Sequence, residues 1–232
     1  MAFKTIYQPR IDCIGVTRTL IEYEYFSGFA LSQKQKSINS LHNAAEKKGI
    51  SKILEISTKS PFDLGTKLSA FNLMLTRNGI KFSVEQIFQA SKVFEQGGPY
   101  LDLYNKTSKE AKMDLRLKNS GKIIAFNFLN SDFPTQPITY FYDWLYSNAL
   151  LENKSNLEEA LKFNAFSDIE FNEKKSINCQ AYSLALFCSI VQNKKEILDK
   201  ETISKEEFLE LCKEEYELRW NLFQSNRKVL PS

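Results

Sequence analysis

The stretch that decides the fold covers residues 75–95 and reads LTRNGIKFSVEQIFQASKVFE. Its first part carries Asn78 and Gly79 between two apolar runs, residues 73–75 and 80–82. Asparagine and glycine both tolerate a positive φ, which a two-residue turn between antiparallel strands requires. The sequence therefore predicts a β-hairpin at this point of the chain.

The second part of the stretch is typical of a helix that begins directly after the hairpin. Ser83 and Gln86 have the spacing of a capping box, in which each side chain accepts a hydrogen bond from a backbone N–H of the first turn. Val84 and Ile87 follow at positions that share one helix face. We expect a helix over residues 83–95 with this face toward the core.

Apolar periodicity and turn residues predict further elements on both sides of this stretch. No internal repeat or low-complexity segment indicates a solenoid or a linker. We expect an α+β fold: a mostly helical single domain around a small sheet, with extra strands and a helix at the N-terminus and a helix at the C-terminus. The expected strands are residues 20–29, 53–56, 123–128 and 166–171, and the expected helices are residues 33–48, 107–117, 140–151, 156–163, 177–198 and 204–223.

The composition excludes several classes of protein. Of the 232 residues, 43% are apolar and 25% charged, which is typical of a globular domain and not of a disordered or collagen-like chain. The net charge of +3 is too small to identify a nucleic-acid-binding protein. The longest apolar run, residues 181–191, is shorter than the roughly 18 residues that span a membrane. Because Lys4 and Arg10 interrupt the N-terminal residues, we expect no signal peptide, no membrane partner and a cytoplasmic location.

The sequence also lacks the residues of several common sites. Its four cysteines form no C-x-x-C pair and His42 is its only histidine, so we expect no metal site. His42 shares the apolar face of the helix predicted at residues 33–48, which favours a packed core histidine. No glycine-rich phosphate loop is present. The acid, base or nucleophile of an enzyme would then be a carboxylate, a lysine or a tyrosine.

One stripe of polar residues combines suitable groups. Glu85, Gln89 and Lys92 recur at i, i+4 and i+7, and would point the same way from one helix. Such residues either form solvated pairs, which stabilise a helix by about 0.2 to 0.5 kcal/mol, or present a carboxylate and an amine to a substrate. The spacing leaves both interpretations open.

Two other groups have a similar pair of interpretations. Lys109, Lys112 and Arg116 form a basic stripe, which either binds phosphates or faces water. Aromatic side chains gather over residues 140–146, where they either pack in the core or offer a platform such as Trp144 for a nucleobase.

Several of these segments resemble the NADAR family, which is named for its link to NAD and ADP-ribose. The segments that carry this resemblance are Leu68–Phe71, Gly79, Ser83–Lys92, Glu110–Lys112 with Arg116, Tyr142–Tyr146 and Asp168–Glu170. Residues 32–37, 98–104 and 172–181 further resemble the branch of that family whose members are antitoxins partnered with DarT toxins.

The resemblance implies a NADAR-like catalytic core over residues 66–195, an N-terminal extension packed on it (1–65) and a C-terminal helical extension (196–232). In the resembled branch, the toxin attaches ADP-ribose from NAD to guanine in DNA, and the NADAR partner is a hydrolase that removes it. We therefore expect an N-glycosidase that acts on ADP-ribosylated single-stranded DNA, releases ADP-ribose and needs no cofactor. Direct binding of the cognate toxin is a further possibility that the resemblance raises.

The same resemblance assigns roles to individual residues. Lys92 would attack the ribose C1 as an amine and form a Schiff base; in a second scheme it stays protonated, as an acid or phosphate ligand, while Glu85 or Glu170 activates water. The residues expected to contact the substrate are Ser69, Phe71, Gln89, Tyr100, Lys112, Arg116, Asp143, Trp144 and Asp168. Among them, Lys112 and Arg116 would hold the diphosphate, and Trp144 or Tyr100 would stack on a base.

Two other functions fit the sequence. Some NADAR relatives are thought to be N-glycosidases for small phosphorylated ribosylamine by-products of riboflavin synthesis. Alternatively, the chain binds ADP-ribose or the toxin without cleaving anything. The size of the substrate distinguishes the first of these from the DNA enzyme, and the need for Lys92 distinguishes the second.

Overall fold

Helices and small sheets of the described residues, 1–173 and 176–228, form the α+β fold that the sequence predicts. Side chains of the C-terminal helix are described as far as residue 221. In this computed structural model, three small sheets of the described residues take the place of the single sheet expected. The predicted segment 172–181 includes residues 174–175, which lie outside the described residues. Within the described part of the chain, no helix is both long enough and apolar enough to cross a membrane.

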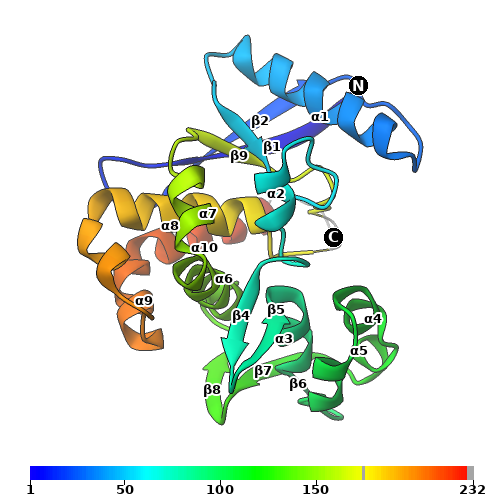
Figure 1. Ribbon diagram of the computed structural model, residues 1–232, viewed down its shortest axis with the longest axis vertical. Helices are drawn as coiled ribbons and strands as arrows, with labels where there is room; N and C mark the ends of the chain where they lie inside the picture. The colour runs from blue at the N-terminus through cyan, green and yellow to red at the C-terminus, as the bar shows by residue number, and fades with distance from the viewer. Residues whose placement is uncertain (174–175, 229–232) are drawn as a thin grey trace.

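The elements follow one another along the chain as Figure 1 shows. The strands are β1 (Ala2–Pro9), β2 (Val16–Tyr23), β3 (Ile53–Glu55), β4 (Met74–Arg77), β5 (Ile80–Ser83), β6 (Lys92–Phe94), β7 (Ile123–Phe128), β8 (Ser131–Pro134) and β9 (Ala165–Ser167). The helices are α1 (Leu31–Glu46), α2 (Asp63–Lys67), α3 (Val84–Ala90), α4 (Ser108–Met113), α5 (Arg116–Asn119), α6 (Tyr140–Glu152), α7 (Lys154–Ala160), α8 (Gln180–Asn193), α9 (Lys205–Leu211) and α10 (Lys213–Lys228), with 3-10 turns η1 (Leu101–Asn105) and η2 (Lys195–Asp199).

A four-stranded sheet in the order β2-β1-β9-β3 forms the upper part of the molecule in Figure 1. Strand β1 pairs antiparallel with both β2 and β9, and β9 runs parallel to β3. Successive side chains of a strand point to opposite faces, so Ile6 packs in the cluster that includes Ile38 and Leu41 of α1, while Tyr7 meets Tyr182 of α8. The sheet is therefore covered on both faces.

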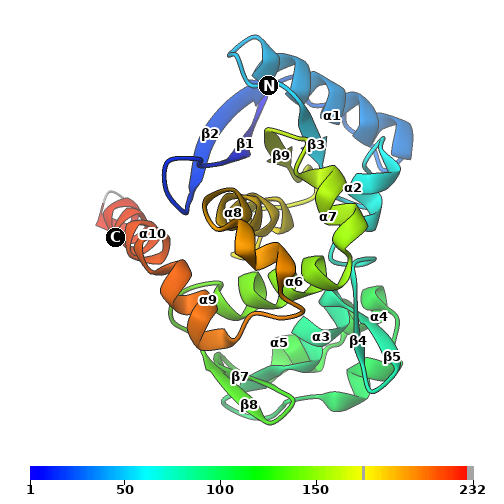
Figure 2. The same ribbon diagram turned by 60° about the vertical axis from the view of Figure 1, so that its left-hand side comes forward.

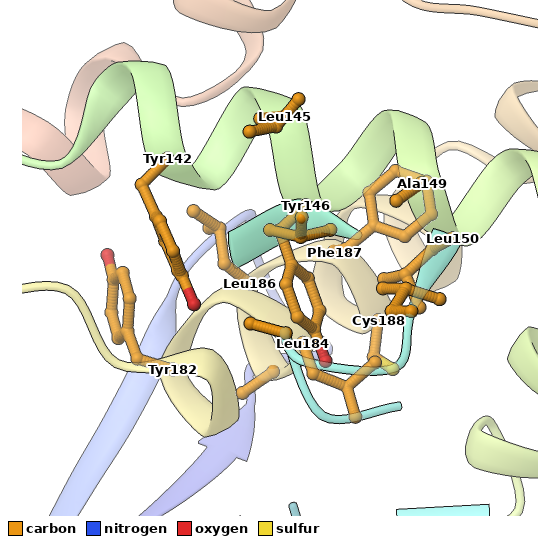
Figure 3. Close-up of a cluster of buried hydrophobic side chains, with 14 of the residues drawn as sticks. Tyr142, Leu145, Tyr146, Ala149, Leu150, Tyr182, Leu184, Leu186, Phe187 and Cys188 are labelled. Atoms are coloured by element: carbon orange, nitrogen blue, oxygen red, sulfur yellow. The ribbon is translucent and has the colours of Figure 1, made fainter. Parts of the chain in front are cut away.

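Helices α6 and α8 cross the middle of the molecule and carry the main core (Figure 3). Figure 3 shows Tyr146 of α6 directed toward Leu184 of α8. Both side chains are completely buried, as are Leu145 of α6 and Phe187 of α8. The hydroxyl of Tyr146 donates to the Leu68 carbonyl at 2.6 Å, which satisfies its polar atom inside the core. This core holds the upper sheet and the lower part of the molecule together.

Truncating a side chain in this core is expected to destabilise the whole fold. The Leu145→Ala variant loses buried methyl groups and leaves a cavity, so its free energy of unfolding should fall by about 2 to 5 kcal/mol. Urea unfolding followed by circular dichroism measures the change. A loss below about 1 kcal/mol would contradict the packing described here.

The lower part of the molecule confirms both predictions from residues 75–95. Strands β4 and β5 form the hairpin, with Asn78 at φ 52° and Gly79 at φ 75°. Ser83 and Gln86 form the capping box at the start of α3. Helix α3 nevertheless ends at Ala90, and Lys92 begins strand β6, which pairs with β7. The prediction of one helix to residue 95 was wrong because strand pairing with β7 replaces the helical hydrogen bonds after Ala90.

Other predicted elements also differ in extent. The strand expected at residues 20–29 is β2, which begins at Val16 and ends at Tyr23. The helix expected at residues 177–198 is α8, which covers residues 180–193. The helix expected at residues 107–117 is divided, because Asp114 leaves the helical conformation between α4 and α5. The one expected at residues 204–223 divides into α9 and α10 at Cys212. The strand expected at residues 166–171 ends at Ser167, because the Asp168 carboxylate accepts backbone hydrogen bonds two and three residues later and forms a turn.

The predicted core (66–195) and the two predicted extensions (1–65 and 196–232) are joined by strand pairing and hydrogen bonds. Strand β9 belongs to the expected core of residues 66–195, yet it pairs with β1 and β3 of the expected extension, residues 1–65. From α10, the buried carboxylate of Glu215 accepts hydrogen bonds from Val16 and Arg18 of β2. The core and the two extensions are therefore not separate packing units. Their boundaries stay a prediction from the sequence.

Candidate active site

A cleft of about 1000 Å³ opens between the lower part of the molecule and the loops below the upper sheet. One wall comes from α3, β6 and α4, the second from the loop that leads into α6, and the third from the turn after β9 and the start of α8. These segments are far apart in sequence, so only the complete fold forms the cleft. It receives Glu85, Gln89 and Lys92 on its first wall.

A chain of hydrogen bonds joins these three side chains. Lys92 Nζ donates to Gln89 Oε1 at 2.7 Å, and Gln89 Nε2 donates to Glu85 Oε1 at 2.7 Å. Although Lys92 lies on β6 and not on the helix, the sharp change from α3 to β6 keeps its side chain beside Gln89. The predicted meeting of an acid and an amine in one cleft is therefore present.

The surroundings of Lys92 disfavour its charged form. Burial lowers the pKa of Lys92 to about 8, Glu85 opposes this shift and Lys112 adds to it. The Phe88 ring, whose centre lies 4.6 Å from the ammonium group, works against the desolvation, because the face of an aromatic ring attracts a cation. Near pH 8, a large fraction of the side chain is then a neutral amine, which is the form that attacks carbon.

The backbone at Lys92 depends on a glycine that the sequence did not single out as a site residue. Gly98 has a φ of +81°, and a Cβ placed on it would lie 2.4 Å from the Lys92 carbonyl oxygen. Any other residue at position 98 would displace the strand that carries Lys92.

Glu85 is 4% exposed and is held by contacts on two sides. Besides Gln89, the ammonium group of Lys112 lies 3.6 Å from its carboxylate. That same ammonium lies 4.9 Å from the centre of the Phe71 ring, which also lines the cleft. The structure thus brings four predicted residues, Phe71, Glu85, Gln89 and Lys112, to one wall with Lys92.

The third wall carries Asp168 and Glu170. The pKa of Asp168 is raised to about 7, first by burial and then by the buried carboxylate of Glu55, while Lys4 opposes the shift. Glu55 in turn accepts hydrogen bonds from Ser167 and the Ile169 amide, so it fixes this wall from behind. Glu170 forms an ion pair with Lys34 of α1 at 3.0 Å.

Five predicted contact residues do not line the cleft, and two of them form a cluster beside it. Arg116 binds two carboxylates, those of Asp102 at 2.6 Å and Asp114 at 2.9 Å, and its guanidinium lies 4.5 Å from the centre of the Tyr100 ring. The Tyr100 hydroxyl is hydrogen-bonded to Ser120. In this structure both side chains are engaged with protein groups.

Of the other three, Ser69 and Asp143 are buried, and Trp144 is partly buried and packs against the core. The indole of Trp144 donates to the Ile203 carbonyl at 2.8 Å, and Ser69 donates to the Thr66 carbonyl at 2.8 Å. Asp143 is 1% exposed and accepts hydrogen bonds from Thr139, Ser183 and Tyr216. All three side chains are hydrogen-bonded to other protein groups, and their contact with a substrate stays a prediction.

The sequence did not single out Tyr142 as a contact residue. Tyr142 precedes Asp143 on α6 and lines the cleft, whereas Asp143 and Trp144 do not. The signal was present in the 140–146 aromatic cluster, but neighbouring helix positions differ by about 100° and the sequence does not say which one faces the cleft. His42 lies outside the cleft, 2.8 Å from Ser167 Oγ, and burial lowers its pKa to about 4, as expected for a packed histidine. Within residues 1–173 and 176–228, no three His, Cys, Asp or Glu side chains are grouped to hold a metal ion.

Comparison with known proteins decides the family. A family model described as DarT1-associated NADAR antitoxin matches residues 2–220, nearly the whole chain. The chain belongs to the DarT1-associated NADAR antitoxin family. No curated protein matches it. The match confirms the predicted resemblance to NADAR proteins and to their DarT-associated branch, and it associates this NADAR antitoxin with a DarT toxin.

Proposed function

We propose that this NADAR antitoxin removes ADP-ribose from guanine bases of single-stranded DNA by cleaving the N-glycosidic bond, and so reverses the modification made by its DarT toxin. One observation carries the proposal: Glu85 and Lys92 reach the same cleft and are joined there through Gln89. An acid and a partly neutral amine are the groups that such a cleavage requires.

The size of the cleft supports a large substrate. Clefts of about 300 to 1,000 Å³ hold drug-sized ligands, and this one lies at the upper end of that range. An ADP-ribosyl group together with the guanine it modifies fills such a space better than a small phosphorylated ribosylamine. This favours the DNA substrate over the small-molecule alternative.

The covalent scheme follows from the contacts of Lys92. Its neutral amine attacks the ribose C1, and the bond from C1 to the guanine nitrogen breaks with its electron pair going to the base. The proton that the amine loses passes through Glu85 to the departing base. The ribose ring then opens to a Schiff base on Lys92, and water hydrolyses this adduct to release ADP-ribose.

Two lysines are suitable for the diphosphate of ADP-ribose. Lys112 and Lys118 line the cleft from α4 and α5. Arg116, the other predicted phosphate ligand, would first have to leave Asp102 and Asp114. We therefore propose that lysines at this end of the cleft contact the diphosphate, as point charges and not as a bidentate clamp.

The covalent scheme predicts a rate that rises with pH. Because the pKa of Lys92 is lowered to about 8, its neutral fraction increases through this region, and kcat/KM should rise tenfold per pH unit below pH 8 and level off above it. A scheme with protonated Lys92 as the acid predicts the reverse, a loss of activity above pH 8. Initial rates between pH 6 and 10 distinguish the two.

The activity itself is tested with an oligonucleotide that carries ADP-ribosyl guanine. The purified protein should return the oligonucleotide to its unmodified mass and release ADP-ribose, as measured by mass spectrometry. A protein that binds the modified strand and leaves its mass unchanged would be a binding antitoxin and would contradict the proposal.

A further inference from the structure

A second hollow of about 540 Å³ continues the cleft toward the C-terminal helix. Both hollows share part of their lining, which shows that they are continuous; the shared residues are Gln136, Pro137, Ile138, Ile177 and Trp220. We name the second hollow the annex. None of the expected catalytic or substrate-binding residues lines it, so the proposed reaction leaves it without a role.

Trp220 stands at the junction of the cleft and the annex. It lies on α10, and 41% of its surface is exposed. The chain contains two tryptophans, and the other, Trp144, packs against Phe128 and Phe133 with its indole nitrogen bonded to Ile203. An exposed indole beside a cleft for a nucleotide is suited to stack on a nucleobase.

The charges of the annex favour a neutral, planar group over a phosphate. Its ionisable side chains include Glu210, Lys213 and Glu217, which give no excess of positive charge. The remaining cation, Arg219, donates to Thr139 Oγ1 and to the Ile177 carbonyl, and lies 4.3 Å from the centre of the Tyr182 ring. The annex therefore offers a phosphate no net positive charge, while a base would meet an apolar wall.

The two ends of the cleft also differ in charge. Lys112 and Lys118 line the end near α4 and α5, and α4 and α10 lie on opposite sides of the molecule in Figure 2. With the diphosphate at the lysine end and C1 at Lys92, the ADP moiety extends away from Trp220. The guanine and the DNA strand that continues from it then extend toward Trp220 and the annex.

We propose that the annex binds the nucleobase next to the modified guanine, which stacks on Trp220. The inference rests on the proposed function, since it names the part of the substrate that extends beyond the reacting bond. It makes single-stranded DNA, and not an isolated modified nucleoside, the preferred substrate.

Steady-state kinetics with two substrates test this role. One substrate is ADP-ribosyl guanosine, and the other is an oligonucleotide with ADP-ribosyl guanine at its centre. Wild-type protein should have the lower KM for the oligonucleotide, and Trp220→Ala should shrink this advantage about five- to tenfold. Leu218→Ala is the matched control, because Leu218 is a 45% exposed apolar residue of the same helix that lines neither hollow.

The ratio of the KM values for the two substrates separates base stacking by Trp220 from contact with the ADP-ribose and from a purely structural role. An equal rise in KM for both substrates would overturn the inference, since Trp220 would then contact the ADP-ribose. An unchanged ratio in Trp220→Ala would overturn it as well. Trp220→Phe, which keeps an aromatic ring, should retain most of the advantage, which a loss of general folding would not allow.

Fluorescence tests the inference even if no hydrolysis is observed. A short unmodified single-stranded oligonucleotide should quench the tryptophan emission of the wild-type protein at low salt, and Trp220→Phe should abolish the quenching while Trp144 still emits. Quenching that persists in Trp220→Phe, or none in the wild type, would contradict the proposed stacking. Failure of the hydrolysis with quenching intact would instead reject the proposed function alone.

Discussion

The Lys92→Met variant is expected to lose hydrolysis of ADP-ribosyl guanine by at least about 10³-fold. Methionine has a similar length but no amine, so the variant cannot form the bond to C1. Because burial already disfavours the charge of Lys92, removing that charge should not lower the free energy of unfolding. Single-turnover rates with the modified oligonucleotide, beside urea unfolding curves, measure both properties.

The exposed Lys81 of β5 lies outside the cleft and gives the control for this variant. Lys81→Met should hydrolyse the substrate at the wild-type rate. If Lys92→Met kept protection against the toxin in cells, the antitoxin would act by binding alone. If it kept more than about a tenth of the activity in vitro, Lys92 would not be the nucleophile.

The second large effect is expected from Glu85→Gln, with kcat reduced about 10²- to 10⁴-fold, the usual contribution of a positioned acid or base. The amide oxygen of the new side chain still accepts the hydrogen bond from Gln89, so the geometry of the wall should be retained. Glu159→Gln, at an exposed position on α7, is the control. Stopped time courses at saturating substrate give kcat and KM separately.

The separate changes in kcat and KM identify the role of Glu85. A fall in kcat with little change in KM indicates that the carboxylate acts in the transition state. A rise in KM with kcat unchanged would show that Glu85 only holds the substrate. Glu170, which is paired with Lys34, would then be the carboxylate expected to activate water.

Local sequence signals predicted the elements whose stability is local. The Asn78-Gly79 turn and the capping box of Ser83 and Gln86 depend on neighbouring residues alone, and both are found. Strand β1 was not predicted. Only its neighbouring residues Ile6 and Tyr7 are buried, one toward α1 and the other toward α8, so the strand lacks a polar-apolar alternation.

In the candidate site, too, the sequence predicted what depends on neighbouring residues and not what depends on packing. Spacing on one helix brought Glu85 and Gln89 together, whereas Lys92 reaches them through a change from helix to strand that depends on pairing with β7. For Trp144 and Asp143, the motif was correctly located on α6 but the direction of each side chain depends on how that helix packs. Trp220 carried no local signal, because its place beside the cleft results from the docking of α10.

Trapping of the enzyme with sodium borohydride tests the central claim most directly. Added during turnover of the ADP-ribosylated oligonucleotide, borohydride should reduce the Schiff base to a stable amine and leave a sugar adduct on one peptide, the one that contains Lys92. The same treatment of Lys92→Met should give no adduct. Continued hydrolysis with no adduct on Lys92, or an adduct on another lysine, would contradict the account.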